Sequence, residues 1–120
     1  MTPDRLPPAV AQYIDGMNDH DWTAVRASLA DEFVRIGPFP EHVFTDPDAY
    51  TQFLADLLPT IEDHTIDVVR VDTVGDVSYV TIREQLRRDG TDVDSYLILA
   101  CDLAPDGRLA RIEAFIRRTA

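Results

Sequence analysis

The sequence predicts an α+β fold in which N-terminal helices pack on a strongly bent antiparallel sheet. Apolar residues recur with helical spacing over roughly the first half of the chain and alternate with polar residues over the second half. The turn signal Asp89-Gly90 separates two long alternating segments. With 120 residues the chain can bury about two-thirds of its unfolded surface, so residues 1–120 are expected to form one domain.

The first helix is expected to begin at Pro7-Pro8, because proline is tolerated in a first turn, and to end near Asn18. Its apolar residues follow the i, i+3, i+4, i+7 spacing of one helical face. They are Val10, Tyr13, Ile14 and Met17.

A second helix is expected after Asp21, whose side chain can accept a hydrogen bond from the first turn. Its apolar side consists of Trp22, Val25 and Leu29. Residues 32–36 then adopt the two-residue period of a strand, which Gly37-Pro38 ends.

A third helix is expected to begin at Pro47, with Asp46 as its cap, and to end at Pro59. Its apolar stripe consists of Tyr50, Phe53, Leu54 and Leu57. From Ile61 onward the chain alternates in long strands.

The Asp89-Gly90 turn sets a register for the sheet. It pairs Arg88 with Thr91, Leu86 with Val93, Glu84 with Ser95, Ile82 with Leu97, and Val80 with Leu99. A four-residue loop over 104–107 then pairs Leu103 with Arg108, Leu99 with Ile112, Leu97 with Ala114, Ser95 with Ile116, Tyr96 with Phe115, and Asp94 with Arg117. Apolar faces coincide in this register, which supports it.

The composition is strongly acidic. There are 11 Lys+Arg, all of them Arg, against 22 Asp+Glu, for a net charge of -11. Such a surface repels phosphate backbones and anionic headgroups, so neither nucleic acid nor a membrane is an expected partner. Cys101 is alone and is expected to be a small core residue. No apolar signal core follows Met1, and a cytoplasmic location is expected.

The three histidines, His20, His42 and His64, are scattered along the chain. Neither a His-x-x-x-His motif nor a cysteine pair exists to hold a metal, so no metal site and no cofactor are expected. Solvent exposure is the stronger interpretation of these side chains.

Glu84 fits its surroundings least. In a strand it shares one face with Val80, Ile82 and Leu86. A carboxylate on a core face is costly unless it is paired, protonated or lines a polar cavity, so Glu84 indicates a pocket and is a candidate general acid or base. The alternative is a carboxylate that reaches solvent or an arginine such as Arg35.

Two aromatic residues of the helices are weaker candidates. Tyr13 can direct its hydroxyl into the pocket as a hydrogen-bond donor, although tyrosines on helical stripes are commonly core residues. Trp22 fits a packing wedge between helix and sheet better than a substrate platform, and it is retained as a candidate ligand contact.

Short motifs in sequence order add a resemblance. They are Asn18-Asp19-His20-Asp21-Trp22, Leu29-Ala30-Asp31-Glu32-Phe33 and Asp106-Gly107-Arg108-Leu109. With the order of elements, they make the chain resemble the NTF2-like superfamily and especially its SnoaL-like branch, related to polyketide cyclases and ketosteroid isomerases. The resemblance implies a cone-shaped domain with a pocket between helices and sheet, often dimeric through the open sheet face. Its members include isomerases, cyclases, dehydratases, epoxide hydrolases and binding modules, so it does not fix the function.

The catalytic residues of these branches are mostly missing. Tyr13 matches the tyrosine of the ketosteroid isomerases, but their aspartate positions correspond to Gly37 and Leu99. The acid-base positions of the SnoaL cyclases correspond to Ile112 and Ala114.

The limonene-type epoxide hydrolases use an Arg-x-Asp pair on a central strand. Glu84 lies near that carboxylate position, but Ile82 occupies the arginine position. The resemblance therefore matches only part of the catalytic residues of any of these branches.

The sequence thus predicts a pocket for a small, largely apolar molecule, with cofactor-independent acid-base chemistry by Glu84 and Tyr13. The open alternative is a non-catalytic ligand-binding or dimerisation module. The expected ligand contacts are Trp22, His42, Ser95, Leu97, Leu99, Ile112 and Ala114. A homodimer is expected through an outer sheet face formed by Tyr79, Arg83, Tyr96, Ile98, Arg111, Glu113 and Phe115.

Overall fold

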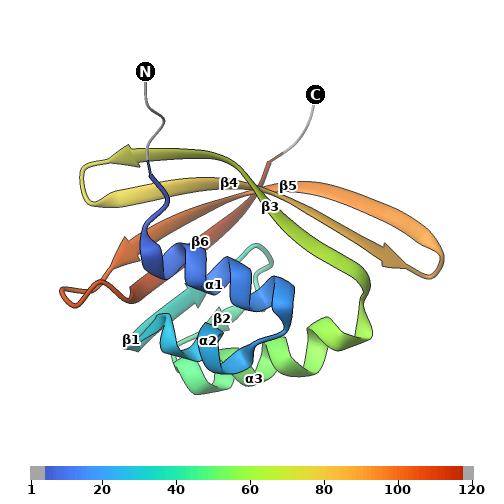
Figure 1. Cartoon of the computed structure of the whole chain (residues 1–120), viewed down its shortest axis with the longest axis horizontal. Helices are drawn as coiled ribbons and strands as arrows, with labels where there is room; N and C mark the ends of the chain where they lie inside the picture. The colour runs from blue at the N-terminus through green and yellow to red at the C-terminus, as the bar shows by residue number, and fades with distance from the viewer. Residues whose placement is uncertain (1–4, 118–120) are drawn as a thin grey trace.

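The computed structural model describes residues 5–117, in which helices precede the long strands (Figure 1). The helices are α1 (Pro8–Asp19), α2 (Trp22–Ala27), α3 (Pro47–Leu57) and the 3-10 turn η1 (Leu58–Thr60). The strands are β1 (Leu29–Ile36), β2 (Val43–Phe44), β3 (Glu62–Val74), β4 (Val77–Arg88), β5 (Thr91–Leu103) and β6 (Leu109–Arg117). None of the helices within 5–117 is long and apolar enough to cross a membrane. The cytoplasmic location stays a prediction.

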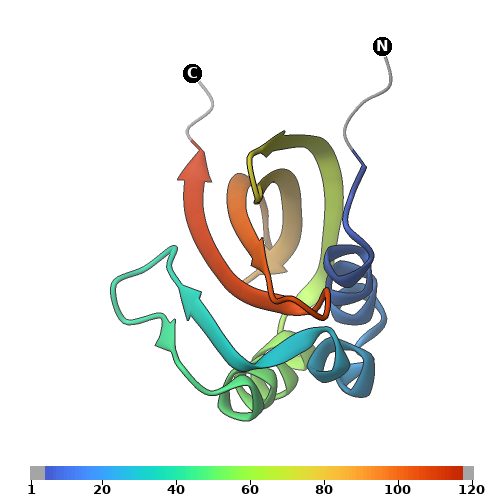
Figure 2. The same ribbon diagram turned by 90° about the vertical axis from the view of Figure 1, so that its left-hand side faces the viewer.

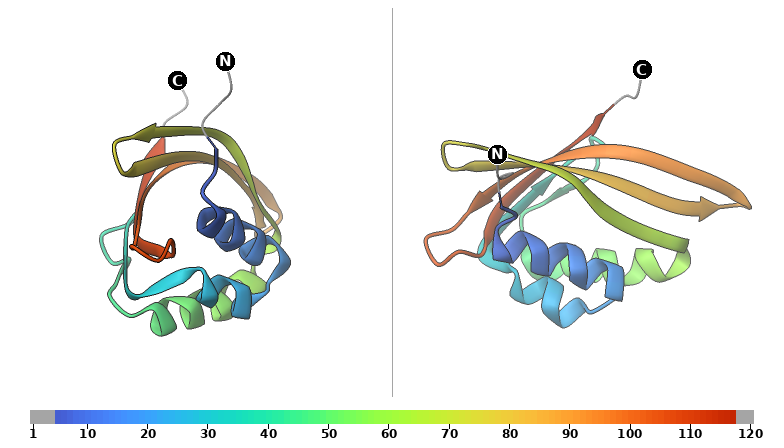
Figure 3. Two further views of the ribbon diagram at one scale, coloured as in Figure 1. Left: turned by 60° about the vertical axis from the view of Figure 1, so that its left-hand side comes forward. Right: turned by 45° about the horizontal axis from the view of Figure 1, so that its top comes forward.

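The strands form one mixed sheet in the order β2-β1-β6-β5-β4-β3. Neighbouring strands are antiparallel except β1 and β6, which run parallel. The sheet curls strongly, with the helices on its hollow side (Figures 1 and 2). Strands β3 to β6 arch over α1 in the left view of Figure 3. The predicted α+β fold is confirmed, and the parallel β1–β6 pair is the feature that the sequence did not predict.

The β4–β5 hairpin has the predicted register. Arg88 pairs with Thr91, and Glu84 pairs with Ser95. Asp89 and Gly90 both have positive φ, 52° and 77°, as a two-residue turn of this kind requires.

The β5–β6 register differs from the prediction by two residues. The observed pairs include Leu97–Ile116, Leu99–Ala114, Cys101–Ile112, Tyr96–Arg117 and Ile98–Phe115. Two local features cause the shift: the loop closes at Leu103–Leu109, one residue later than expected, and a bulge follows before Asp102–Arg111. All six predicted pairs of these strands are therefore wrong: Leu103–Arg108, Leu99–Ile112, Leu97–Ala114, Ser95–Ile116, Tyr96–Phe115 and Asp94–Arg117. A two-residue shift nevertheless leaves each side chain on its predicted face.

The helix caps agree with the sequence, but the second helix is shorter than predicted. The Asp21 carboxylate accepts a hydrogen bond from Ala24 N at 3.1 Å, and Asp46 accepts one from Asp48 N at 2.9 Å. Leu29 does not continue α2. It begins β1, because it pairs there with Leu109 of β6.

The two-residue strand β2 is too short to show a period in the sequence. Phe44 of β2 pairs with Arg35 of β1, and Gly37 N donates to His42 O at 2.9 Å across the turn. This hairpin brings the rings of His42 and Phe44 within 5.6 and 4.9 Å of the Phe53 ring on α3.

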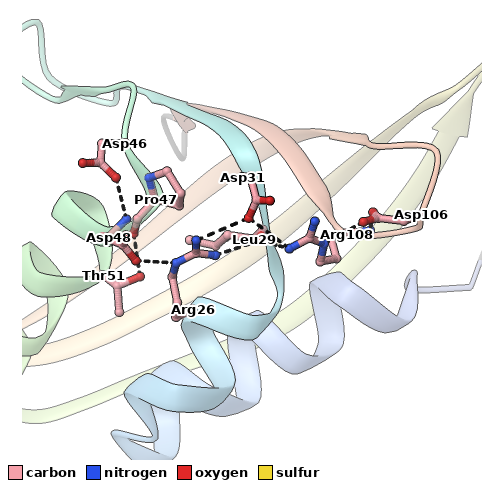
Figure 4. A network of polar contacts seen from close by, with 9 residues as sticks. All are labelled: Arg26, Leu29, Asp31, Asp46, Pro47, Asp48, Thr51, Asp106 and Arg108. Atoms are coloured by element: carbon pink, nitrogen blue, oxygen red, sulfur yellow. Dashed lines mark hydrogen bonds and ion pairs between the residues drawn. The ribbon is translucent and has the colours of Figure 1, made fainter.

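Two arginines connect α2, α3 and the β5–β6 turn to the start of β1 (Figure 4). Arg26 donates to Asp48 in the first turn of α3 at 2.6 Å and to Leu29 O at 3.1 Å. Arg108 lies 3.4 Å from the Asp31 carboxylate and also donates to Leu29 O. Each partly exposed ion pair contributes only about 1 kcal/mol or less. Arg26 links α3 to the start of β1, and Arg108 links the β5–β6 turn to it.

The core fills the space between the helices and the hollow side of the sheet. Its fully buried side chains include Val10, Phe33 and Val80. Cys101 is 1% exposed, and burial raises the pKa of its thiol to about 12. The thiol therefore stays protonated and packs as a small apolar group.

Gly37, the residue after β1, lies close to Ala114 of β6. Its φ is +78°, and a Cβ at this position would lie 2.5 Å from Ala114 O. No other residue type fits there without a shift of backbone.

We expect Gly37→Ala to destabilise the fold more than Gly75→Ala. Both glycines have left-handed φ, +78° and +60°, but nothing lies within 4 Å of a Cβ at Gly75. The left-handed backbone costs alanine about 1–2 kcal/mol at either site, and the forced shift of β6 should add about 1–3 kcal/mol at Gly37. Urea unfolding measures both. Equal losses would contradict the close approach of β1 to β6.

Candidate active site

A cavity of about 210 Å³ lies between α1, α3 and the hollow side of the sheet. Most of its wall is apolar, formed by Met17, Phe39, Phe44, Phe53, Leu54, Leu57, Leu58, Ile61, Ile66, Ile82, Leu86, Leu97 and Leu99. Its polar lining consists of Tyr13, Arg35, His42, Tyr50, His64, Glu84 and Arg88. An apolar enclosure with a few convergent polar groups is the usual form of a small-molecule site.

Glu84 reaches this cavity from β4 and pairs with His64 of β3. Glu84 Oε2 lies 2.9 Å from His64 Nε2, and the two side chains are 29% and 2% exposed. The carboxylate is thus paired, as its position on an apolar face requires. Arg35, the other partner considered from the sequence, makes its hydrogen bonds elsewhere.

The prediction that His64 is solvent-exposed is wrong. A bulge between Glu62–Arg87 and Thr65–Gln85 interrupts the β3–β4 ladder, and Asp63 within it has a φ of 53°. An extra residue in a strand redirects the side chains beside it, and here His64 lies on the buried side with Ile66. The alternation of His64 with the apolar Ile66 is the sequence signal that could have found it.

The Glu84 contact determines which nitrogen of His64 can accept a proton. An ionised carboxylate only accepts hydrogen bonds, so Nε2 must carry hydrogen and donate. Nδ1 is buried and has no hydrogen-bond partner among the described residues. In the neutral ring Nδ1 is then an acceptor that neither the described residues nor solvent reaches, so the partly exposed Glu84 is the member of the pair that a bound molecule can contact.

A second polar cluster joins α1, α3 and β1. The hydroxyls of Tyr13 and Tyr50 are hydrogen-bonded at 2.5 Å, and Arg35 Nη1 donates to both, at 3.1 and 3.0 Å. Arg35 Nε donates to Gly37 O at 3.0 Å. Burial alone would lower the pKa of Arg35, but the larger combined effect of Tyr50 and Tyr13 raises it above the usual value. The guanidinium therefore stays charged.

Tyr13 remains a hydrogen-bond donor over a wide pH range. Burial raises its pKa most, and Tyr50 adds to this effect, whereas Arg35 opposes it. The net result is a pKa well above the usual value. The neutral hydroxyl can therefore donate to an oxygen of a bound molecule at physiological pH.

The other predicted contacts divide into two groups. His42, Leu97 and Leu99 line the cavity, as do the candidate catalytic residues Tyr13 and Glu84. Four residues are absent from its lining: Trp22, Ser95, Ile112 and Ala114. Trp22 instead stacks on His20 with ring centroids 5.4 Å apart. Ile112 and Ala114 are buried in the core, and Ser95 is the cross-strand neighbour of Glu84.

Sequence reasoning did not include Arg35, Tyr50 or His64 among the site residues. Arg35 follows the buried Phe33 by two positions in β1, so strand alternation could have placed it on the inner face. Tyr50 was assigned to a helical apolar stripe, where its hydroxyl gave no signal of its own. Within residues 5–117, no group of three or more His, Cys, Asp or Glu residues is arranged to hold a metal ion.

The family model of the SnoaL-like domain matches residues 10–112, so the chain belongs to the SnoaL-like family. Comparison with curated proteins gives no match. Among solved structures, a protein of ketosteroid isomerase-like fold from Catenulispora acidiphila, in complex with trimethylamine, has a TM-score of 0.81 at 11% identity, over 92% of this chain and 86% of that one.

Two other structural neighbours are named as enzymes. An epoxide hydrolase of the LEH-like type from M. tuberculosis has a TM-score of 0.78 at 15% identity, over 92% of this chain and 81% of that one. A candidate polyketide cyclase from Sinorhizobium meliloti has a TM-score of 0.77 at 21% identity, over 91% and 94%. At such identities these likenesses show the shared fold alone.

We expect Tyr13→Phe to reduce the loss of stability at alkaline pH. The unfolded chain loses the Tyr13 proton near pH 10, whereas the folded protein keeps it, so wild-type stability falls as pH rises above about 10. The phenylalanine variant lacks this contribution. Its free energy of unfolding should fall less between about pH 9 and pH 11.

Tyr79→Phe is the control, because Tyr79 is 38% exposed and outside the cavity. It should keep the wild-type slope of stability against pH, measured by urea unfolding. Identical slopes for Tyr13→Phe and wild type would contradict the strong burial of the Tyr13 hydroxyl.

Proposed function

We propose that this protein is a cofactor-independent acid-base enzyme that acts on a small, largely apolar molecule, in the class of isomerases, cyclases and hydrolases. The observation that carries the proposal is the Glu84–His64 pair, because Glu84, His64 and Tyr13 all line the same cavity. Proton-transfer groups and a hydrogen-bond donor in one apolar cavity are what such catalysis requires.

The roles follow from the hydrogen-bonding capacity of each group. Glu84, whose side chain is 29% exposed, removes a proton from substrate or water, and His64 holds the carboxylate in place through its hydrogen bond. This keeps the acid-base role expected for Glu84 from the sequence and adds His64 as a positioning residue. Tyr13 donates a hydrogen bond to a substrate oxygen and thereby orients the substrate.

A non-catalytic ligand-binding module is the second candidate. It is favoured by the apolar or small residues at positions that carry catalysis in related branches, such as Leu99, Ile112 and Ala114. In that case the His64–Glu84 pair would serve only to satisfy a buried carboxylate.

The test is turnover of a panel of small apolar epoxides and unsaturated ketones by wild type and by Glu84→Gln. The amide can still accept the His64 Nε2–H bond but carries no charge, so the fold should persist while turnover falls by about 10²–10⁴-fold. His64→Gln, which removes the ring that positions the carboxylate, should cause a smaller loss. Product formation by mass spectrometry and thermal melts measure the two effects.

Glu32→Gln is the matched control, since Glu32 is an exposed carboxylate of β1 outside the cavity lining. It should turn over substrate at the wild-type rate. Binding without turnover, unchanged in Glu84→Gln, would instead favour the binding module.

We also propose that the outer sheet face forms a symmetric homodimer contact. Tyr79 and Phe115 are 38% and 49% exposed on this face, and Ile98 pairs with Phe115 beside them. Arg83 is already paired with Asp94 at 2.6 Å, so the aromatic residues and not this arginine supply the buried contact area.

Light scattering should report roughly twice the 13.5 kDa chain mass at micromolar concentration. Phe115→Asp should give monomers, because a charge would be buried without a partner. Val74→Asp is the control, since Val74 is 66% exposed at the β3–β4 turn, and it should stay dimeric. A monomeric wild type would contradict the proposed contact.

A further inference from the structure

Arg35 is unusual among the arginines of this protein. Arg26, Arg70, Arg83, Arg87, Arg108 and Arg111 each pair with a carboxylate near the surface. Arg35 and the exposed Arg88 both line the cavity without a carboxylate at ion-pair distance within residues 5–117, and Arg35 is the more buried of the two. A half-buried guanidinium is costly without an anionic partner, and it cannot lower that cost by losing its proton.

The nearest acidic influence does not fill this role. Glu84 is the carboxylate whose field reaches Arg35, but its hydrogen bond goes to His64. The direct partners of the guanidinium are two neutral hydroxyls and the Gly37 carbonyl. The positive charge therefore lacks a counter-ion in direct contact.

A count of hydrogens shows that this cluster has donors to spare. Arg35 Nη1 and Nε are used by Tyr13, Tyr50 and Gly37, whereas Nη2 makes no hydrogen bond within the described residues. Only one hydroxyl proton is needed for the Tyr13–Tyr50 bond, so the other hydroxyl has a proton left to donate. The cluster thus presents a cation with free N–H and O–H donors and lacks an acceptor.

The wall that continues from this cluster is aromatic. The ring centroid of Phe44 lies 5.3 Å from that of Tyr50 and 4.9 Å from that of Phe53. The ring centroid of His42 lies 5.6 Å from that of Phe53. These rings line the cavity and offer an apolar surface to the body of a ligand.

We propose that Arg35, Tyr13 and Tyr50 form a carboxylate-binding subsite, and that the molecule held in the cavity is an apolar monocarboxylic acid. This names the substrate class of the proposed function and rests on it. The carboxylate receives hydrogen bonds from Arg35 Nη2 and from the spare tyrosine hydroxyl, and the apolar body lies along Phe44 and Phe53. The far end of the molecule then lies toward His64 and Glu84, where proton transfer takes place.

The first test compares acids with their neutral isosteres by isothermal titration calorimetry at neutral pH. The pairs are phenylacetate with phenylacetamide, and hexanoate with hexanamide. In each pair the acid should bind about 10- to 100-fold more tightly, the range expected for hydrogen bonds to charged groups. Equal affinities, or acids that do not bind, would overturn the subsite.

The second test uses variants of the full chain with the same probes. Arg35→Gln should lose the preference for the acid by a similar factor, whereas Arg70→Gln, which removes an exposed arginine paired with Asp72 at 2.7 Å, should keep it. Glu84→Gln should bind the acid as tightly as wild type or more tightly, because it removes a negative charge whose field reaches Arg35.

These results separate the subsite from the proposed catalysis. Tight, Arg35-dependent binding of acids without turnover of any acid by wild type would support the subsite and count against the enzyme. Turnover of neutral substrates that Arg35→Gln leaves unchanged would support the enzyme and overturn the subsite. The wild-type comparison of acid and amide decides the question even where Arg35→Gln fails to fold.

Discussion

The hydrogen bonds of Arg35 to Tyr13 and Tyr50 determine much of this structure, because each residue comes from a different element. They join β1, α1 and α3 at one point inside the protein. The guanidinium keeps its charge and donates to both hydroxyls, so the three elements share one set of hydrogen bonds. The cavity therefore has a fixed polar end that its apolar wall alone would not provide.

The opposite end of the cavity is built on different principles. Glu84 is placed by ordinary strand alternation, whereas His64 is placed by an irregularity, the bulge near the start of β3. Without the bulge, this face of the sheet would be regular and Glu84 would have no partner on β3. The bulge places His64 beside it. Strained or irregular backbone beside polar groups is commonly retained where it serves a site.

Local patterns in the sequence predicted the faces of β4, β5 and β6, but not the burial of His64 in β3, and they predicted less about which residues meet. The Asp89-Gly90 turn is a strong local signal, and the β4–β5 register follows from it. The register of β5 and β6 depends on a bulge whose cause is not written in the alternation of residues, so the prediction missed it by two positions.

The parts of the site that were missed all depend on long-range contacts. His64 and Glu84 are 20 residues apart, and Tyr13 and Tyr50 are 37 apart. Glu84 was recognised because a charge on an apolar face is visible in one segment. Arg35 and Tyr50 were not, because each resembles an ordinary residue of its own element until the three elements are brought together.

The parallel pairing of β1 with β6 has a consequence for how the protein folds. Residues 29 and 109 are neighbours in the sheet, so β1, which carries Arg35, can pair with β2 early but gains its second partner, β6, only after the other strands have been made. Contacts between such distant segments are slow to form because a long loop must close first. During synthesis the hairpins of β3, β4 and β5 can pair early, while the ligand cavity can assemble only at the end.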